Sequence, residues 1–478
     1  MQFNSFAFLG FFALLTGLYY VVPQRWRWPL LLVASYYFYS QFQLVYVLLL
    51  AYSTLCAYGF GLWMERRSER SRLLLTAAVL AQLAILVLFK YVDFFVGLLE
   101  SAFAPLSGAE ALALPRLGWL LPAGLSFFVF SAISYVVDVH RRTIPAERHL
   151  GHFALYLAFF PKLVAGPIER AGPFLEQLRE GAVFITANVT FGLQLLLWGL
   201  FKKVVVADNL AAFVDVAFTN PDFQSPVALI VAVYFYAFQI YCDFSGYSDI
   251  AIGLAAILGF RLMENFKRPY FSRSVPEFWS HRWHISLANW FRDYLYIPLG
   301  GSRVSKPRWY ANQMTVFIVS GLWHGANLTF VIWGALNGLY QVLYFAFGGA
   351  RKAVSSRLPG FLWGALGLLL TFHLVLFSWI FFRAESVGDA WSVITKIFNN
   401  LGMLPMLLPA YNWSASFWMA LGLIGFLILV EALDEFRQLW AWLAQRPTFL
   451  RWGFYYGLIA VLLVFGQWGM SQFVYMQF

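Results

Sequence analysis

Charge is scarce in this sequence. Lys and Arg number 33 and Asp and Glu 23 among 478 residues, so 12% of the chain is charged, whereas 61% is hydrophobic and 20% aromatic. Soluble domains carry about 25% charged residues. The composition excludes a disordered, collagen-like or disulfide-rich secreted protein and indicates a membrane protein with many spans. The net charge of +10 is assigned to membrane orientation. No nucleic-acid binding is expected, because the basic residues cluster in short segments between apolar runs.

Common catalytic signatures are also missing. The chain has no Gly-Lys pair for a phosphate-binding loop, no His-Glu pair for a zincin and no serine in a GxSxG frame, which disfavours ATP-driven transport and hydrolysis by an elbow serine. No histidine is followed five residues later by Asp, so any acyl transfer must use a design other than the His-x4-Asp arrangement. The two cysteines, Cys56 and Cys242, lie in apolar runs without metal-ligand spacing and are predicted to be packing residues.

Long apolar runs are abundant. The first 22 residues lack a basic start and a cleavage site and are predicted to be a retained first span. Further runs long enough to cross a bilayer lie near 29–46, 47–64, 73–89, 119–137, 188–208, 226–258, 313–347, 360–382, 414–432 and 452–470. We therefore expect an all-α polytopic protein of about ten to twelve spans. Without a repeat or linker, residues 1–478 are predicted to form one integral membrane domain with a motif-rich core at about 150–347.

Some apolar stretches are predicted to be interrupted. The runs 226–258 and 313–347 are too long for one simple span, and the second is expected to fold as two helices or a broken one because glycines punctuate it. Prolines interrupt 159–179, which favours a re-entrant or cytoplasm-facing loop. The aromatic and basic stretch 265–301 is typical of an amphipathic segment at the cytoplasmic interface.

Orientation follows from the positions of Lys and Arg. They concentrate in segments 23–28, 65–72, 138–187, 259–312, 349–358 and 433–452. The positive-inside rule places these segments in the cytoplasm and the N-terminus on the opposite side of the membrane.

Polar residues inside the apolar run 239–253 are candidates for a functional or bracing role. They are Gln239, Asp243, Ser245, Tyr247 and Asp249. An ionised Asp at membrane depth costs about 2.5–3.5 kcal/mol, so the two carboxylates should face a cavity or a partner. They either line a tunnel or brace a helix break, and bracing is favoured. A covalent acyl intermediate on Cys242 or Ser245 is disfavoured because neither has a histidine adjacent in sequence.

The seven histidines divide by context. His140, His149 and His152 lie in or beside a polar loop, and His373 stands alone in an apolar run where bonding between helices is at least as plausible as a function. His281 and His284 would share a face if 277–293 were helical, but no further ligand lies near, so no metal site is predicted.

His324 is the strongest catalytic candidate among the histidines. It lies in VSGLWHGANLTF with Trp323 before it and Asn327 three residues on. Burial favours the neutral imidazole, which can act as a base. The alternative is a histidine that is bonded to a neighbouring helix.

Taken together, three motifs resemble the membrane-bound O-acyltransferase family. They are WHG at 323–325, RWHISLANWFRDYLYIPLGG at 282–301 and QIYCDFSGYSDIAIG at 239–253. FFPKLVAGPIERAGPF, beginning at residue 159, and the terminal FVYMQF resemble the bacterial alginate O-acetyltransferase branch, whose relatives act in peptidoglycan and cellulose acetylation and in teichoic-acid D-alanylation.

The resemblance implies a ring of helices around a central tunnel. It makes His324 the essential intramembrane histidine and His284 the second family position, with Trp323 and Asn327 as tunnel or structural polar residues. Candidate contacts for donor phosphates at the cytoplasmic mouth are Arg282, Arg292, Lys267 and Arg268, and each could equally be an anchor of membrane orientation.

The implied activity is acetyl transfer across the inner membrane. The donor would be acetyl-CoA in the cytoplasm, and the acceptor an extracytoplasmic polysaccharide or a periplasmic acetyltransferase partner. The rival hypothesis is a transporter or channel that uses Asp243, Asp249 and His373 as a polar relay, although the chain has none of the paired halves common in transporters.

Overall fold

The computed structural model describes residues 1–103, 114–411, 413–469 and 473, and within these ranges the chain is helical with no β-strand. Of the terminal motif FVYMQF, Phe473 is described and the rest lies outside the described residues. This agrees with the all-α prediction.

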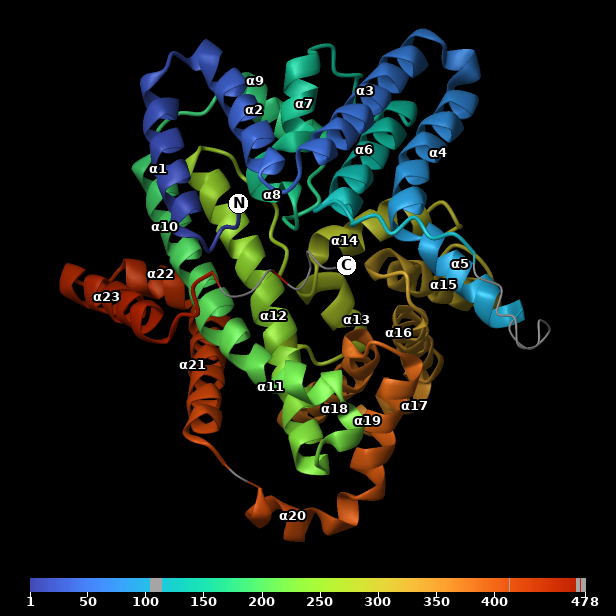
Figure 1. Ribbon diagram of the computed structural model, residues 1–478, viewed down its shortest axis with the longest axis vertical. Helices are drawn as coiled ribbons and strands as arrows, with labels where there is room; N and C mark the ends of the chain where they lie inside the picture. The colour runs from blue at the N-terminus through green and yellow to red at the C-terminus, as the bar shows by residue number, and fades with distance from the viewer. Residues whose placement is uncertain (104–113, 412, 470–472, 474–478) are drawn as a thin grey trace.

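The N-terminal helices fill the upper part of Figure 1, apart from α5, which extends to the right. They are α1 (Phe6–Val21), α2 (Gln24–Ser40), α3 (Leu44–Arg66), α4 (Ser71–Lys90), α5 (Val92–Phe103), α6 (Leu125–His140), α7 (Leu150–Ala158), α8 (Phe160–Leu163) and α9 (Ala171–Glu180), with a short 3₁₀ turn η1 (Ser68–Arg70). As expected from its prolines, the 159–179 stretch is not one helix, because it divides between α8 and α9.

Two long helical segments cross the centre of the protein (Figure 1). The first combines α10 (Thr186–Leu200), the π-helical η2 (Phe201–Ala207) and α11 (Asp208–Thr219), and the second is α12 (Pro226–Ile257), which follows the short η3 (Pro221–Phe223). The prediction that 226–258 could not be one simple span is wrong, since α12 is a single helix of 32 residues. Its length is supported by packing, because most of its residues are buried against neighbouring helices.

The rest of the chain contains the site region and a C-terminal group. The site region comprises η4 (Pro269–Phe271), α13 (Val275–Glu277), η5 (Phe278–Arg282), α14 (Ile285–Phe291), η6 (Arg292–Tyr296), α15 (Lys306–His324), α16 (Leu328–Ala346) and α17 (Gly348–Ser355). The C-terminal group comprises α18 (Gly360–Arg383), α19 (Val387–Asn399), η7 (Leu401–Met403), α20 (Leu404–Ala410), α21 (Ala415–Arg437), α22 (Leu439–Ala444) and α23 (Thr448–Phe465).

The predicted break in 313–347 is confirmed. α15 ends at His324 and α16 begins at Leu328, so the WHG motif lies at the break between two helices. The helices approach closely through glycines: a Cβ on Gly321 would lie 2.2 Å from the carbonyl oxygen of Phe330, and one on Gly334 2.3 Å from that of Phe317. Only glycine permits this distance, which places the end of α15 firmly against α16.

Eight helices among the described residues are long and apolar enough to cross a membrane, or nine if the bent pair of α19 and α20 is one span. Two of the expected spans form shorter apolar helices, α1 and α6, of 16 residues each. These two helices account for most of the difference between the predicted and the observed number of spans. The prediction counted apolar runs, whereas the observed number depends on the length of each helix.

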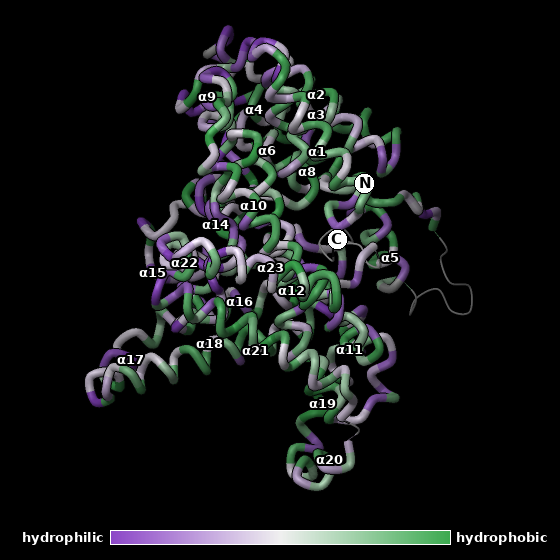
Figure 2. Tube along the Cα trace, turned by 90° about the vertical axis from the view of Figure 1, so that its left-hand side faces the viewer, coloured by the Kyte–Doolittle hydropathy of each residue, from purple (hydrophilic) through white to green (hydrophobic). Residues whose placement is uncertain are grey.

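Several of the basic segments lie on one side of the protein, which we call the basic side. In Figure 2, α9, α14, α15, α17 and α22 lie along the left of the view, whereas the N-terminus, α5 and α11 lie on the right. The helices on the left belong to or adjoin the sequence segments in which Lys and Arg concentrate. Segments far apart in the chain thus share a face, and its position on the cytoplasmic side of the membrane stays a prediction.

Candidate active site

His284 is held in an unusual backbone conformation. Its φ of 46° lies in the left-handed region, between η5 and α14. The next residue, Ile285, donates its N–H to the carbonyl of Asn265 at 2.9 Å, and Ser286 donates N–H and Oγ–H to the Asn265 side chain at 3.2 and 2.9 Å. Asn265 in turn donates to Ser248 Oγ on α12 at 3.0 Å. This network ties the His284 turn to the central helix and supports the strained conformation.

His281 and His284 do not share a helical face, because 277–293 is not one continuous helix. The stretch 277–293 is interrupted by the π-helical turn and by the left-handed residue at 284. His281 is exposed and its Nδ1 lies 2.5 Å from Ser280 Oγ, whereas His284 is buried. Local spacing could not reveal this bend, since it depends on contacts from Asn265.

His324 is the last residue of α15, and a distant helix binds the carbonyl groups at this end. Lys90 Nζ at the end of α4 donates to the carbonyls of Trp323 at 2.5 Å and of His324 at 3.0 Å. The hydroxyl of Tyr91 donates to the carbonyl of Leu322 at 2.6 Å. A cation at a helix C-terminus satisfies carbonyls that have no partner within the helix. The sequence analysis assigned no site role to Lys90 or Tyr91, because more than 200 residues separate them from the motif.

The two histidines face one another in an aromatic environment. Their ring centroids are 6.5 Å apart, and the side chains are 2% and 3% exposed. Trp323 contacts both rings, with centroid distances of 5.9 Å to His284 and 4.8 Å to His324. Other rings in contact with one histidine or the other are those of Phe127, Phe244, Phe266, Trp333 and Phe382.

Burial controls the charge of His284, which lies outside the candidate membrane spans. Its apolar surroundings lower the pKa of the imidazole to about 3, because an imidazolium cannot be solvated there. At neutral pH the ring is therefore neutral, with one nitrogen able to donate a hydrogen bond and the other able to accept one.

A cavity of about 400 Å³, here called the histidine cavity, contains both rings. His284 and His324 lie among its apolar lining residues, while Ser280, His281, Arg292, Tyr296 and Gln313 supply polar groups. Several of these belong to the basic segment 259–312, so the cavity is formed largely by elements of the basic side. A space of this size can hold an acyl thioester and part of its carrier arm.

Three of the four predicted phosphate-binding cations are brought together, and Arg292 is not among them. Arg282 donates to the carbonyls of Lys267 and Arg268 at 3.3 Å, and Glu435 is shared by Arg268 and Arg282. Arg292 lines the histidine cavity; it is 57% exposed and its Nε lies 2.8 Å from Asp293. Arg282 binds Glu277 at 2.7 Å and Glu435 at 2.8 Å. Lys267 and Arg268 line a different cavity, and Arg268 forms ion pairs with Asp434 and Glu435.

The carboxylates of α12 have lysine partners that the sequence analysis did not assign to them. Asp243 lies 2.7 Å from Lys203 Nζ, with both side chains 1% exposed, and the same lysine is 2.9 Å from Asp208. Asp249 lies 2.8 Å from Lys202. Both lysines belong to the π-helical turn η2, so these pairs connect the two long central segments. Ion pairs between buried partners correspond to the bracing alternative.

The remaining predicted polar residues lie around the site without lining the histidine cavity. Gln239 and Ser245 are buried on α12, as is Cys242, and the Tyr247 ring stacks on Phe3 at 4.8 Å. Asn327 begins α16 by accepting a hydrogen bond from the Thr329 N–H at 3.1 Å, and it donates to the carbonyl of Glu385 at 2.7 Å.

His373 is bonded between helices. Its Nε2 lies 2.9 Å from the Tyr234 hydroxyl and its Nδ1 2.8 Å from the carbonyl of Leu369. No group of three or more His, Cys, Asp or Glu side chains among the described residues is placed to hold a metal ion.

Comparisons with known proteins identify the family of this helical membrane protein. Residues 31–349 match the membrane-bound O-acyltransferase family. The chain is 40% identical over 401 residues to a probable alginate O-acetylase of Azotobacter vinelandii, which covers 83% of this chain and 77% of the relative. It is 34% identical over 416 residues to a peptidoglycan O-acetyltransferase of Helicobacter pylori, covering 81% and 76%. A teichoic acid D-alanyltransferase of Bacillus subtilis is 25% identical over 55% of this chain and 68% of the relative.

The chain belongs to the membrane-bound O-acyltransferase family. The resemblance drawn from its motifs is thereby confirmed. The protein is a multi-pass membrane enzyme of the acyltransferase class.

Proposed function

We propose that this enzyme is an inner-membrane O-acetyltransferase that takes acetyl from acetyl-CoA in the cytoplasm and passes it across the membrane for O-acetylation of an extracytoplasmic polysaccharide. The single observation that carries the proposal is the buried pair of His284 and His324, 6.5 Å apart in the histidine cavity. The acetyl group and the polysaccharide class are carried over from relatives named as alginate O-acetylase and peptidoglycan O-acetyltransferase.

His324 is the proposed general base. It takes the proton of the acceptor hydroxyl while the hydroxyl oxygen attacks the thioester carbonyl, so that a C–O bond forms and the C–S bond then breaks. The thiolate leaves on the cytoplasmic side, and the proton on His324 passes to it or to water. A base in this position accelerates transfer by about 10²–10⁴-fold.

His284 is proposed to stabilise the oxyanion of the tetrahedral intermediate or to position the thioester. Its neutral ring supplies one N–H donor, and a donor in a site without water is worth far more than in solution. The network from Asn265 to Ser286 and Ser248 holds the ring in place before the substrate arrives.

Arg292 is the cation we assign to the donor phosphates. It lines the histidine cavity and is 57% exposed, with its Nε paired to Asp293, whereas Arg268 and Arg282 are less exposed and each binds two carboxylates. An exposed guanidinium near a cavity opening suits a phosphate that stays in water while the thioester enters. The acceptor, either the polysaccharide or a periplasmic partner enzyme, approaches from the opposite side of the membrane.

No observation favours the relay transporter. Asp243 and Asp249 pair with separate lysines, and His373 bonds to Tyr234 and its own helix. These contacts brace helices, and none of them joins one of the three residues to another.

The test is base-released acetate from cell-surface polysaccharides in cells that carry the native enzyme, His324→Ala or His373→Ala at matched membrane levels. We expect ester acetate to disappear with His324→Ala and to persist with His373→Ala, which removes an apolar-run histidine outside the site. Acetate that is unchanged with His324→Ala contradicts the base assignment.

A further inference from the structure

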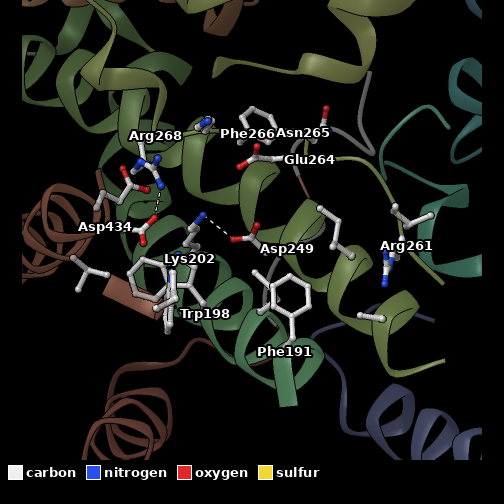
Figure 3. A pocket seen from close by; sticks show the side chains of 18 of the residues that line it. Phe191, Trp198, Lys202, Asp249, Arg261, Glu264, Asn265, Phe266, Arg268 and Asp434 are labelled. Carbon is white, nitrogen blue, oxygen red and sulfur yellow. Dashed lines mark hydrogen bonds and ion pairs between the residues drawn. The ribbon is translucent and has the colours of Figure 1, made fainter. Parts of the chain in front are cut away.

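A second cavity of about 470 Å³ lies on the basic side, and its role is not explained by acyl transfer. It is formed by α10, α12, α21, α22 and the loop after α12, and we call it the ion-pair cavity (Figure 3). Phe266 lines it and also packs against His284 of the histidine cavity, with ring centroids 6.3 Å apart. One aromatic layer therefore separates the two cavities.

Some charged groups of the ion-pair cavity are already satisfied. The dashed lines in Figure 3 join Lys202 to Asp249, at 2.8 Å, and Arg268 to Asp434. In each pair two opposite charges of the lining compensate one another.

Three charged side chains of the loop after α12 line the cavity without such partners. Glu264, Arg261 and Lys267 form no side-chain hydrogen bond or ion pair with the described residues. In Figure 3 the loop carries Arg261 on the right, Glu264 near the centre and Arg268 on the left, so the carboxylate lies between cations. Burial raises the pKa of the Glu264 carboxyl, and the charges of Lys267 and Arg268 act against this shift. A further cation in direct contact with the carboxylate would stabilise its ionised form.

The opposite wall of the cavity is apolar and is formed largely by a candidate membrane span. Phe191, Leu195 and Trp198 follow one another along α10, a candidate span, and Trp440 closes the wall from α22. Phe191 is 49% exposed on the outer surface of the protein. The cavity thus combines a charged rim with an apolar wall at the end of membrane spans, which is the depth of lipid headgroups.

We propose that the ion-pair cavity binds a phospholipid with a zwitterionic headgroup that carries a primary ammonium. The ammonium pairs with Glu264, the phosphate pairs with Arg261 or Lys267, and an acyl chain lies along Phe191 and Trp198. A polyanion such as a nucleotide is disfavoured, because Asp249, Glu264, Glu431 and Asp434 give the lining as many acids as it has cations.

The experiment measures lipid binding to the purified full-length enzyme in detergent. The probes are phosphatidylethanolamine, phosphatidylcholine and phosphatidylglycerol with identical acyl chains, and retention is counted by native mass spectrometry. We expect preferential binding of phosphatidylethanolamine. Glu264→Gln should weaken it about fivefold, the scale of one accessible ion pair, without weakening phosphatidylglycerol. Arg261→Gln combined with Lys267→Gln should weaken both lipids.

Matched controls remove the same charges elsewhere on the basic side. Glu176 and Arg303 are exposed and form no side-chain ion pair with the described residues, so Glu176→Gln and Arg303→Gln should bind as the native enzyme does. Glu264→Lys should reverse the preference toward phosphatidylglycerol, a gain that misfolding cannot produce.

Three outcomes overturn the proposal: equal retention of the three lipids, no effect of Glu264→Gln, or displacement of the lipid by acetyl-CoA at the same site. The last would make the cavity a donor site. Because the readout is binding, its failure is distinguishable from failure of the proposed acetyl transfer.

Discussion

The histidine cavity and the ion-pair cavity are neighbours, but they differ in the polar groups that they bury and in how these groups are compensated. The first surrounds two imidazoles, 6.5 Å apart, with aromatic rings, while the second contains carboxylates matched with Lys202 and Arg268. A neutral imidazole can be buried at small cost and still exchange a proton, whereas a buried carboxylate needs a counter-charge. The difference separates groups available for chemistry from groups that hold helices together or bind a charged ligand.

Replacing the proposed base should have the largest effect on activity. His324→Gln should lower the rate of acetyl transfer by about 10²–10⁴-fold while leaving the melting temperature close to native, because glutamine keeps polar atoms in the cavity. The measurement is transfer from acetyl-CoA by purified enzyme alongside a thermal unfolding curve. Retention of most of the native rate would place the base elsewhere.

Replacing a bracing cation should affect stability instead. Lys203→Met leaves Asp243 and Asp208 without their lysine in a buried position, and loss of one partner of a buried pair typically costs about 3–5 kcal/mol. The expected result is a strongly lowered melting temperature and a reduced yield in membranes. Lys352→Met on exposed α17 is the control and should unfold as the native enzyme does. If Lys203→Met unfolds as the native enzyme does, the ion pairs of Lys203 do not stabilise the fold.

The turn that carries His284 should be sensitive to Asn265. Asn265→Ala removes the acceptor for Ser286 and the donor to Ser248, which should cost about 1–3 kcal/mol of stability and lower kcat by releasing the His284 ring. Asn265→Asp retains the acceptor and should recover part of the kcat. Equal kcat for the two variants would mean that the network acts on folding alone.

Arg292 should have the smallest effect, confined to donor binding. Arg292→Gln should raise the KM for acetyl-CoA about fivefold, as expected for one exposed ion pair, with little change in kcat. Arg303→Gln serves as the matched control and should leave KM unchanged. If Lys267→Gln raises the KM for acetyl-CoA and Arg292→Gln does not, the donor phosphates bind in the ion-pair cavity.

The motifs around the histidines were readable from the sequence, but their geometry was not. The WHG motif and its break in 313–347 were predicted, because glycines and a polar residue in an apolar run are local signals. The condition under which His281 and His284 would share a helical face is not met, because residue 284 lies in a left-handed turn that bonds to Asn265. Lys90 was missed for the same reason, since its carbonyl partners belong to a helix end more than 200 residues away.

By itself, the sequence determined the membrane class, the helical fold, the family and His324 as the leading candidate, because hydrophobicity and short motifs are properties of the chain. Only the tertiary structure decided that α12 is one helix, that the carboxylates of α12 pair with the lysines of η2, and which cation lines the histidine cavity. These features depend on which helices meet. In a protein whose spans are similarly hydrophobic, that choice is made by close packing at glycines and by pairing of buried charges.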